Sequence, residues 1–137
     1  MKKLDFKTKL VILQMMFPIM GWSQCTNWLE IEDNEEVQTS YVIYRDLLRV
    51  GKFGEAFKYW ELVYEIAPAA DGKRGTVYRD GRSFLIQRFY QEPDKQRKKE
   101  IADRIRKLVK EEIECYPESK IELPDREILK FGLEKME

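Results

Sequence analysis

The 137-residue chain has no histidine, which removes the side chain that most often serves as a general base or a metal ligand. Two cysteines without any histidine also fall short of the ligand set that a zinc site needs. The adjacent carboxylates Glu111 and Glu112 point to different sides of a helix, so they do not form the pair that acid–base catalysis uses. We therefore expect no catalytic residues, no metal site and no cofactor, in a protein that is not an enzyme.

The chain also lacks an excess of charge of either sign, because 25 basic residues balance 25 acidic ones. Such a surface offers nucleic acid no general attraction, and we expect no nucleic-acid partner. The basic run Lys95–Lys99 is the exception. In the same predicted helix, opposite charges stand four residues apart and can pair along its surface, at Glu100–Arg104, Asp103–Lys107 and Lys110–Glu114. We interpret this face as solvated, with an acidic partner at Lys95–Lys99 as the alternative.

One long apolar run is present, from Leu10 to Met20, and it is too short to span a bilayer comfortably. Lysines precede it, at Lys2, Lys3, Lys7 and Lys9. Pro18 and Gly21 end any helix in this run, and Gly21 and Ser23 are small residues at the two positions that a signal peptidase reads. Residues 1–23 are therefore predicted to be a signal peptide cleaved after Ser23. We expect no transmembrane segment in the mature chain. A buried N-terminal helix is the alternative.

Two cysteines, Cys25 and Cys115, remain after this cleavage. Exported proteins meet an oxidising environment in which disulfides form, so a bridge between the two is one expectation. Cys25 is also the first cysteine after the apolar run, and a lipid on its thiol is the competing use. The residue before it, Gln24, is larger than the residue that lipoprotein processing requires. The sequence leaves both uses open.

Two helical patterns, separated by a glycine and ended by a proline, predict an antiparallel helical hairpin in the middle of the chain. Apolar side chains recur three to four residues apart in a first helix from about Glu35 to Val50. Gly51 tolerates the left-handed conformation that ends this helix. The second helix is lined by Ala56, Tyr59, Trp60, Val63 and Ile66. Pro68 lacks the amide hydrogen needed to continue it.

This hairpin resembles the tetratricopeptide repeat through five signature residues: Gly51, Phe53, Ala56, Trp60 and Pro68. The first helix departs from the signature, with Ser40 in place of the usual tryptophan and Tyr44 in place of a small residue. The resemblance implies an all-α fold, in which antiparallel helix–turn–helix hairpins are stacked as a short TPR-like α-solenoid. An ordinary antiparallel hairpin is the alternative.

The rest of the chain follows the same plan less faithfully. The signal peptide is followed by four predicted segments: 24–34 (N-terminal segment), 35–68 (first repeat), 69–117 (divergent second repeat) and 118–137 (terminal or capping helix). In the second repeat, Gly81 suits a place where two helices touch, and a long helix runs from about Asp94 to Tyr116. The final helix has no partner helix in this chain, so it caps the stack or the sequence is a piece of a longer array.

The resemblance implies a non-enzymatic scaffold or adaptor, exported to the periplasm or cell envelope of a Gram-negative bacterium, that binds a protein or peptide on its concave face. Tyr41, Arg45 and Arg82 are the candidate partner-binding residues, because they place amphipathic bodies and charge on the first helices of the two repeats. The aromatic residues as a set also fit a packed core. The alternative function is that of a structural envelope component, lipid-anchored through Cys25. The identity of the partner and the oligomeric state are left open.

Overall fold

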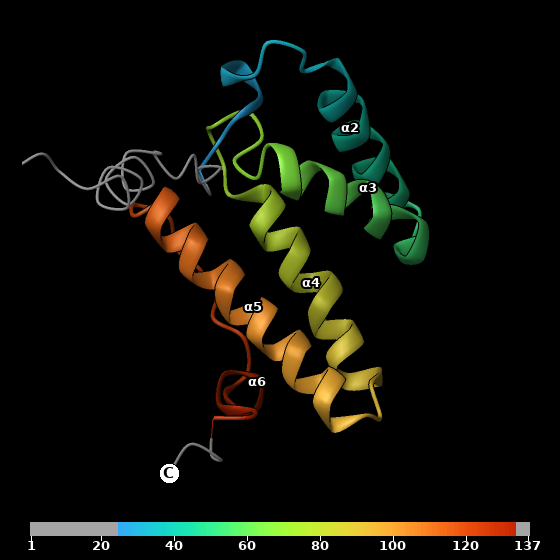
Figure 1. Cartoon of the computed structure of the whole chain (residues 1–137), viewed down its shortest axis with the longest axis vertical. Coiled ribbons are helices and arrows are strands. Elements are labelled where there is room, and N and C mark those ends of the chain that lie inside the picture. Colours follow the sequence, from blue (N-terminus) through green and yellow to red (C-terminus); the bar gives the residue numbers. More distant parts are fainter. Residues whose placement is uncertain (1–24, 134–137) are drawn as a thin grey trace, which may run out of the picture.

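The computed structural model describes residues 25–133, which form helices and connecting segments without any strand (Figure 1). In chain order the elements are a short 3-10 helix η1 (Trp28–Glu30), α2 (Glu35–Arg49), α3 (Phe53–Ile66), α4 (Thr76–Gln91), α5 (Lys95–Cys115) and α6 (Arg126–Lys130). The expected all-α fold is confirmed for this part of the chain. The proposed signal peptide, residues 1–23, lies outside the described residues. None of the described helices combines the length and the apolar character that crossing a membrane requires.

The first pair of helices, α2 and α3, is the antiparallel hairpin that the sequence predicted (Figure 1). Gly51 makes the turn between them in the left-handed region, with a φ of 78°. The amides of Gly51 and Lys52 donate to the carbonyls of Leu48 (3.0 Å) and Leu47 (2.9 Å), which satisfies carbonyl groups at the end of α2. The left-handed turn therefore sends α3 back along α2.

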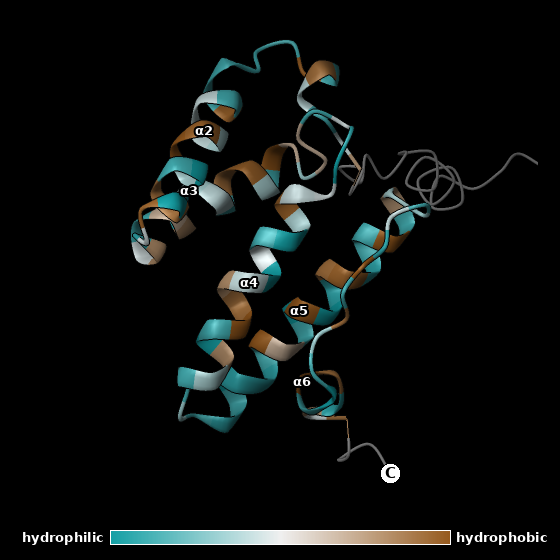
Figure 2. Ribbon diagram, turned by 180° about the vertical axis from the view of Figure 1, so that it is seen from behind, coloured by the Kyte–Doolittle hydropathy of each residue, from teal (hydrophilic) through white to brown (hydrophobic). Residues whose placement is uncertain are grey.

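The second pair, α4 and α5, is also antiparallel and lies side by side in both views of the molecule (Figures 1 and 2). The side chain of Asp94 accepts a 2.9 Å hydrogen bond from the amide of Arg97, which caps the start of α5. The observed bounds of α5 differ from the predicted Asp94–Tyr116 by one residue at each end. Figure 2 shows hydrophobic and hydrophilic residues alternating along these helices, as expected when one face is buried.

The two hairpins meet where α3 crosses α4, and Trp60 lies at the centre of this contact. Its side chain is fully buried, and its indole N–H donates to the carbonyl of Val77 over 2.8 Å. Gly81 lies against the same ring, so the small residue expected at this helix contact is confirmed. Besides Trp60, the largest fully buried side chains of the core are those of Tyr44, Tyr78, Phe89, Leu85, Ile105, Leu108 and Ile128.

Residues 25–31 pack against the α3–α4 connection, so the N-terminal segment is an integral part of the fold. A disulfide joins Cys25 to Cys115 at the end of α5, with the two Cα atoms 5.4 Å apart. The amide of Trp28 donates to the carbonyl of Ala70 over 2.9 Å. The pairing that the sequence left open is present in the structure, and it uses the thiol that a lipid on Cys25 would need.

Candidate functional site

Two adjoining hollows lie over α2, the α3–α4 connection and α4, and we name them together the basic groove. The first hollow has a volume of about 340 Å³ and is lined by Tyr41, Arg45, Ala70, Asp71, Lys73, Arg74, Thr76 and Arg79. The second has a volume of about 540 Å³ and shares Lys73, Arg74, Thr76 and Arg79 with the first. Its other lining residues are Gly75, Arg82, Ser83, Ile86, Glu112, Ser119, Lys120, Glu122, Leu123 and Pro124. The first helices of both hairpins therefore contribute to one continuous surface.

The three predicted partner-binding residues all lie at this groove, but they differ in accessibility. Tyr41 and Arg45 line the first hollow, and both are half-buried. The ring of Tyr41 packs edge to face against Trp28, with the ring centroids 5.2 Å apart. Arg82 is only 6% exposed, and its guanidinium pairs with Glu112. The expectation for Arg82 is therefore corrected, because a buried guanidinium that already holds a carboxylate is not open to a partner.

Asp80 of α4 receives two hydrogen bonds from α2 and thereby ties the hairpins together beside the groove. The Tyr44 hydroxyl donates to Asp80 Oδ2 over 3.0 Å, and Nη1 of Arg45 donates to the same oxygen over 2.8 Å. Burial, assisted by the charge of Asp80, raises the pKa of Tyr44. Burial works to lower the pKa of Arg45, but the hydrogen bond to Asp80 and the charge of that carboxylate raise it on balance. Tyr44, which replaces the small residue of the repeat signature, therefore serves as a polar link to α4.

Glu112 of α5 lies under the groove and adjoins the start of α4. Its carboxylate pairs with Arg82, and the two side chains are 8% and 7% exposed. A Cβ atom on Gly75, the residue before α4, would lie 2.5 Å from Glu112 Oε1, so the carboxylate fills the space beside the first turn. A negative charge is favoured at the positive end of a helix. We interpret Arg82 and Glu112 as structural residues that hold the floor of the groove.

Four exposed cations that the sequence reasoning missed line the groove: Lys73, Arg74, Arg79 and Lys120. None of them takes part in an ion pair among residues 25–133, in contrast to Arg45 and Arg82. The neighbours Lys73 and Arg74, with Arg79 shortly after them, were a readable signal in the sequence. Lys120 joins them only because the segment after α5 returns beside α4. The groove can therefore bind an anionic group without breaking an internal ion pair.

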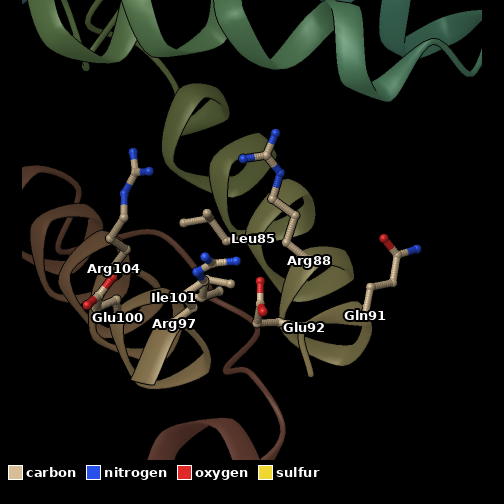
Figure 3. A pocket seen from close by; sticks show the side chains of 8 residues that line it. All are labelled: Leu85, Arg88, Gln91, Glu92, Arg97, Glu100, Ile101 and Arg104. Atoms are coloured by element: carbon tan, nitrogen blue, oxygen red, sulfur yellow. The ribbon is translucent and has the colours of Figure 1, made fainter. Parts of the chain in front are cut away.

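A third hollow, separate from the basic groove, lies between the C-terminal half of α4 and the N-terminal half of α5, and we name it the α4–α5 pocket (Figure 3). Its volume is about 490 Å³, and it is lined by Leu85, Arg88, Gln91, Glu92, Arg97, Glu100, Ile101 and Arg104. Figure 3 shows Arg88 and Arg104 projecting from the two helices toward α3. The guanidinium of Arg88 lies 3.6 Å from the centroid of the Phe57 ring, and Arg104 donates to Glu61 over 3.3 Å. Side chains of α3 thus orient two of the three arginines in the pocket.

The basic run Lys95–Lys99 at the start of α5 is partly used within the fold. Lys99 pairs with Asp103 over 2.8 Å, and this hydrogen bond is the largest cause of the lowered pKa of Asp103. Of the three pairs predicted along α5, only Lys110–Glu114 forms, at 3.8 Å, because other side chains lie closer to the remaining partners. The run therefore contains fewer unpaired cations than the sequence suggested.

Among the described residues, no group of three or more histidine, cysteine, aspartate or glutamate side chains is placed to hold a metal ion. The chain matches no protein-family model, and comparisons with curated proteins and with solved structures found no significant match. The functional interpretation therefore rests on the geometry and charge of the basic groove and of the α4–α5 pocket.

Proposed function

We propose that this protein is an exported, non-enzymatic adaptor that binds a protein or peptide partner in the basic groove. The observation that carries the proposal is the set of four exposed cations in one concave surface, each without an ion pair among residues 25–133: Lys73, Arg74, Arg79 and Lys120. Although the charges of the whole chain balance, this local excess of positive charge favours an anionic ligand through electrostatic complementarity. The partner is expected to present carboxylates to the groove.

A tetratricopeptide-like stack is the frame that we propose for this groove. Two antiparallel hairpins follow one another in the chain, and α3 packs on α4 through Trp60 and Gly81. The first helix of each hairpin, α2 or α4, lines the groove. Stacked helical repeats present extended concave surfaces of this kind to their partners.

Export to the periplasm or cell envelope of a Gram-negative bacterium is supported by two independent features. Residues 1–23 have the charge, the apolar run and the small residues of a cleaved signal peptide. The disulfide between Cys25 and Cys115 belongs to the chemistry of oxidising compartments.

The alternative, an envelope component lipid-anchored through Cys25, competes with the disulfide for the same thiol. Mass spectrometry of the mature protein under non-reducing conditions distinguishes the two. A free or pyroglutamyl Gln24 at the N-terminus, with the mass of an intact disulfide, is expected for the adaptor. A mature chain that begins with a lipidated Cys25 would establish the anchor instead.

The adaptor is tested by cross-linking and affinity recovery from an envelope fraction. The Arg79→Glu variant reverses one unpaired charge of the groove, and we expect it to lose partners that the unaltered chain recovers. The matched control is Lys95→Glu, the same reversal at the other basic cluster. Loss of the partner with Lys95→Glu alone would move the binding site to α5, and recovery of a nucleotide or a turnover product without any protein partner would contradict the adaptor.

A further inference from the structure

The α4–α5 pocket is separate from the basic groove and has the volume of a small-molecule site. Its volume of about 490 Å³ lies within the range of roughly 300–1,000 Å³ that ligand pockets occupy. The half-buried Ile101 supplies apolar surface beside Leu85, which is only 1% exposed, and three arginines from both helices surround them (Figure 3). Six of the eight lining residues are charged or polar, so the pocket would hold a ligand mainly through its arginines.

Arg88 is oriented for binding by stacking on an aromatic ring. Its guanidinium lies 3.6 Å from the centroid of Phe57, which is only 6% exposed and therefore fixed in the core. Stacking uses the flat face of a guanidinium and leaves the N–H donors at its edge free to bind an anion. No ion pair among residues 25–133 involves Arg88 or Arg97, so both charges are uncommitted.

The charge balance of the pocket selects the kind of anion. Three arginines and two glutamates line it, so the lining as a whole carries a net charge of +1. Glu61 of α3 offsets part of the charge of Arg104, since two nitrogens of that guanidinium donate to one carboxylate oxygen over 3.3 and 3.4 Å. The carboxylates Glu92 and Glu100 would repel a second negative charge on a ligand. A monoanion is therefore favoured over a polyanion.

We propose that the α4–α5 pocket binds a small amphipathic monoanion, with its charged group held by Arg88 and Arg97 and its apolar body against Ile101. This inference does not depend on the adaptor function, because the pocket shares no lining residue with the basic groove. The shared chemistry of its ligands is one negative group on an apolar body, either aliphatic or aromatic.

Anilinonaphthalene sulfonate, a monoanion with an aromatic body, is a direct fluorescent probe for the disulfide-bonded chain. We expect saturable binding that octanoate displaces and that inorganic phosphate and tripolyphosphate do not. If octanoate displaces the probe, the site accepts aliphatic bodies. If only aromatic carboxylates displace the probe, the site accepts aromatic bodies alone. Displacement by phosphate or tripolyphosphate at lower concentration than octanoate would overturn the proposal.

Variants locate the probe. Arg97→Gln removes a side chain that makes no ion pair, and Arg88→Gln removes the stacked one. Each is expected to weaken probe binding about tenfold, the loss that one charge-assisted hydrogen bond accounts for. Arg79→Gln in the basic groove is the matched control and is expected to leave probe binding unchanged. Equal binding by Arg97→Gln and the unaltered chain, with both variants folded by circular dichroism, would refute the proposal. Arg97→Gln is expected to recover the protein partner as the unaltered chain does. A loss of probe binding in this variant therefore tests the pocket and not the adaptor.

Discussion

The indole of Trp60 occupies the space that a side chain on Gly81 would need. A Cβ atom at Gly81 would lie 2.2 Å from Cζ2 of Trp60, closer than any real Cβ contact. The two residues belong to different hairpins, and their approach sets how closely α3 can cross α4. The glycine therefore weakens α4 locally as a helix former but permits the main contact between the hairpins.

Gly81→Ala is expected to destabilise the protein despite the higher helix propensity of alanine. Alanine gains about 1 kcal/mol of propensity in a helix, whereas overpacking a core costs about 1–3 kcal/mol. The Trp60 ring has to move, and we expect a net loss measured by urea unfolding. Gly54→Ala in α3 is the matched control, since a Cβ there meets no atom within 4 Å. That variant is expected to be as stable as the unaltered chain or more so, and a stabilising Gly81→Ala would contradict the contact.

The buried pair of Arg82 and Glu112 predicts a large cost for removing either partner alone. Arg82→Met leaves an uncompensated carboxylate in a site where both side chains are less than one tenth exposed, and such a loss costs about 3–5 kcal/mol. The double variant Arg82→Met with Glu112→Leu should lose less than the sum of the single variants. Glu61→Gln, which removes the half-exposed partner of Arg104, should cost no more than about 1 kcal/mol. Additive single costs in a double-mutant cycle would show that the buried charges do not interact.

Reduction of the disulfide is expected to lower the stability substantially. Cys25 and Cys115 are 90 residues apart in the sequence, and the bridge removes about 4–5 kcal/mol of chain entropy from the unfolded state in the loop-closure model. Urea unfolding with and without reductant measures this difference. A chain with both cysteines replaced by serine is the control, because reductant should not change its stability. If reductant left the unaltered chain equally stable, the bridge would have no role in holding residues 25–31.

Stability is expected to fall as the pH rises above about 10. Burial raises the pKa of Tyr44, Tyr64 and Tyr78 above the ordinary tyrosine value of 10.0. Because the pKa is raised in the folded state, the unfolded chain loses the phenolic proton at a lower pH than the folded chain does. The contribution of each tyrosine to the free energy of unfolding is therefore complete below pH 10 and declines as the pH rises above it. The fully buried Tyr44 and Tyr78 each contribute a slope of about 1.4 kcal/mol per pH unit, and the half-buried Tyr64 contributes less. Urea unfolding between about pH 9 and pH 11, a range that spans the ordinary pKa of tyrosine, measures this slope.

Tyr44→Phe supplies the control for this pH dependence. The variant lacks one of the three phenols whose pKa is raised, so the decline in stability above pH 10 should be shallower by the share of one tyrosine. Tyrosinate absorbance should show the same phenols ionising only as the protein unfolds. A free energy of unfolding that stays constant across this range would be incompatible with the burial of Tyr44 and Tyr78.

Local chemistry explains why the helices were predictable. The turn at Gly51 and the bounds of α5 depend on residues close together in the chain. The fate of Arg82 depends instead on Glu112 of another helix, and no local pattern contains that pairing. Helical spacing likewise showed which charges can pair along α5. It could not show that Arg104 pairs instead with Glu61 of α3.

The sequence by itself determined the helices, the first hairpin and the absence of histidine chemistry, because periodicity, turn residues and composition act within a few residues or over the whole chain. Only the tertiary structure decided that Cys25 bonds to Cys115, that Arg82 is buried, and that Lys120 joins Lys73 in one groove. Each of these is a contact between segments that are far apart in the sequence. They depend on how the hairpins cross, which follows from packing such as that of Trp60 on Gly81 and cannot be read from spacing along the chain.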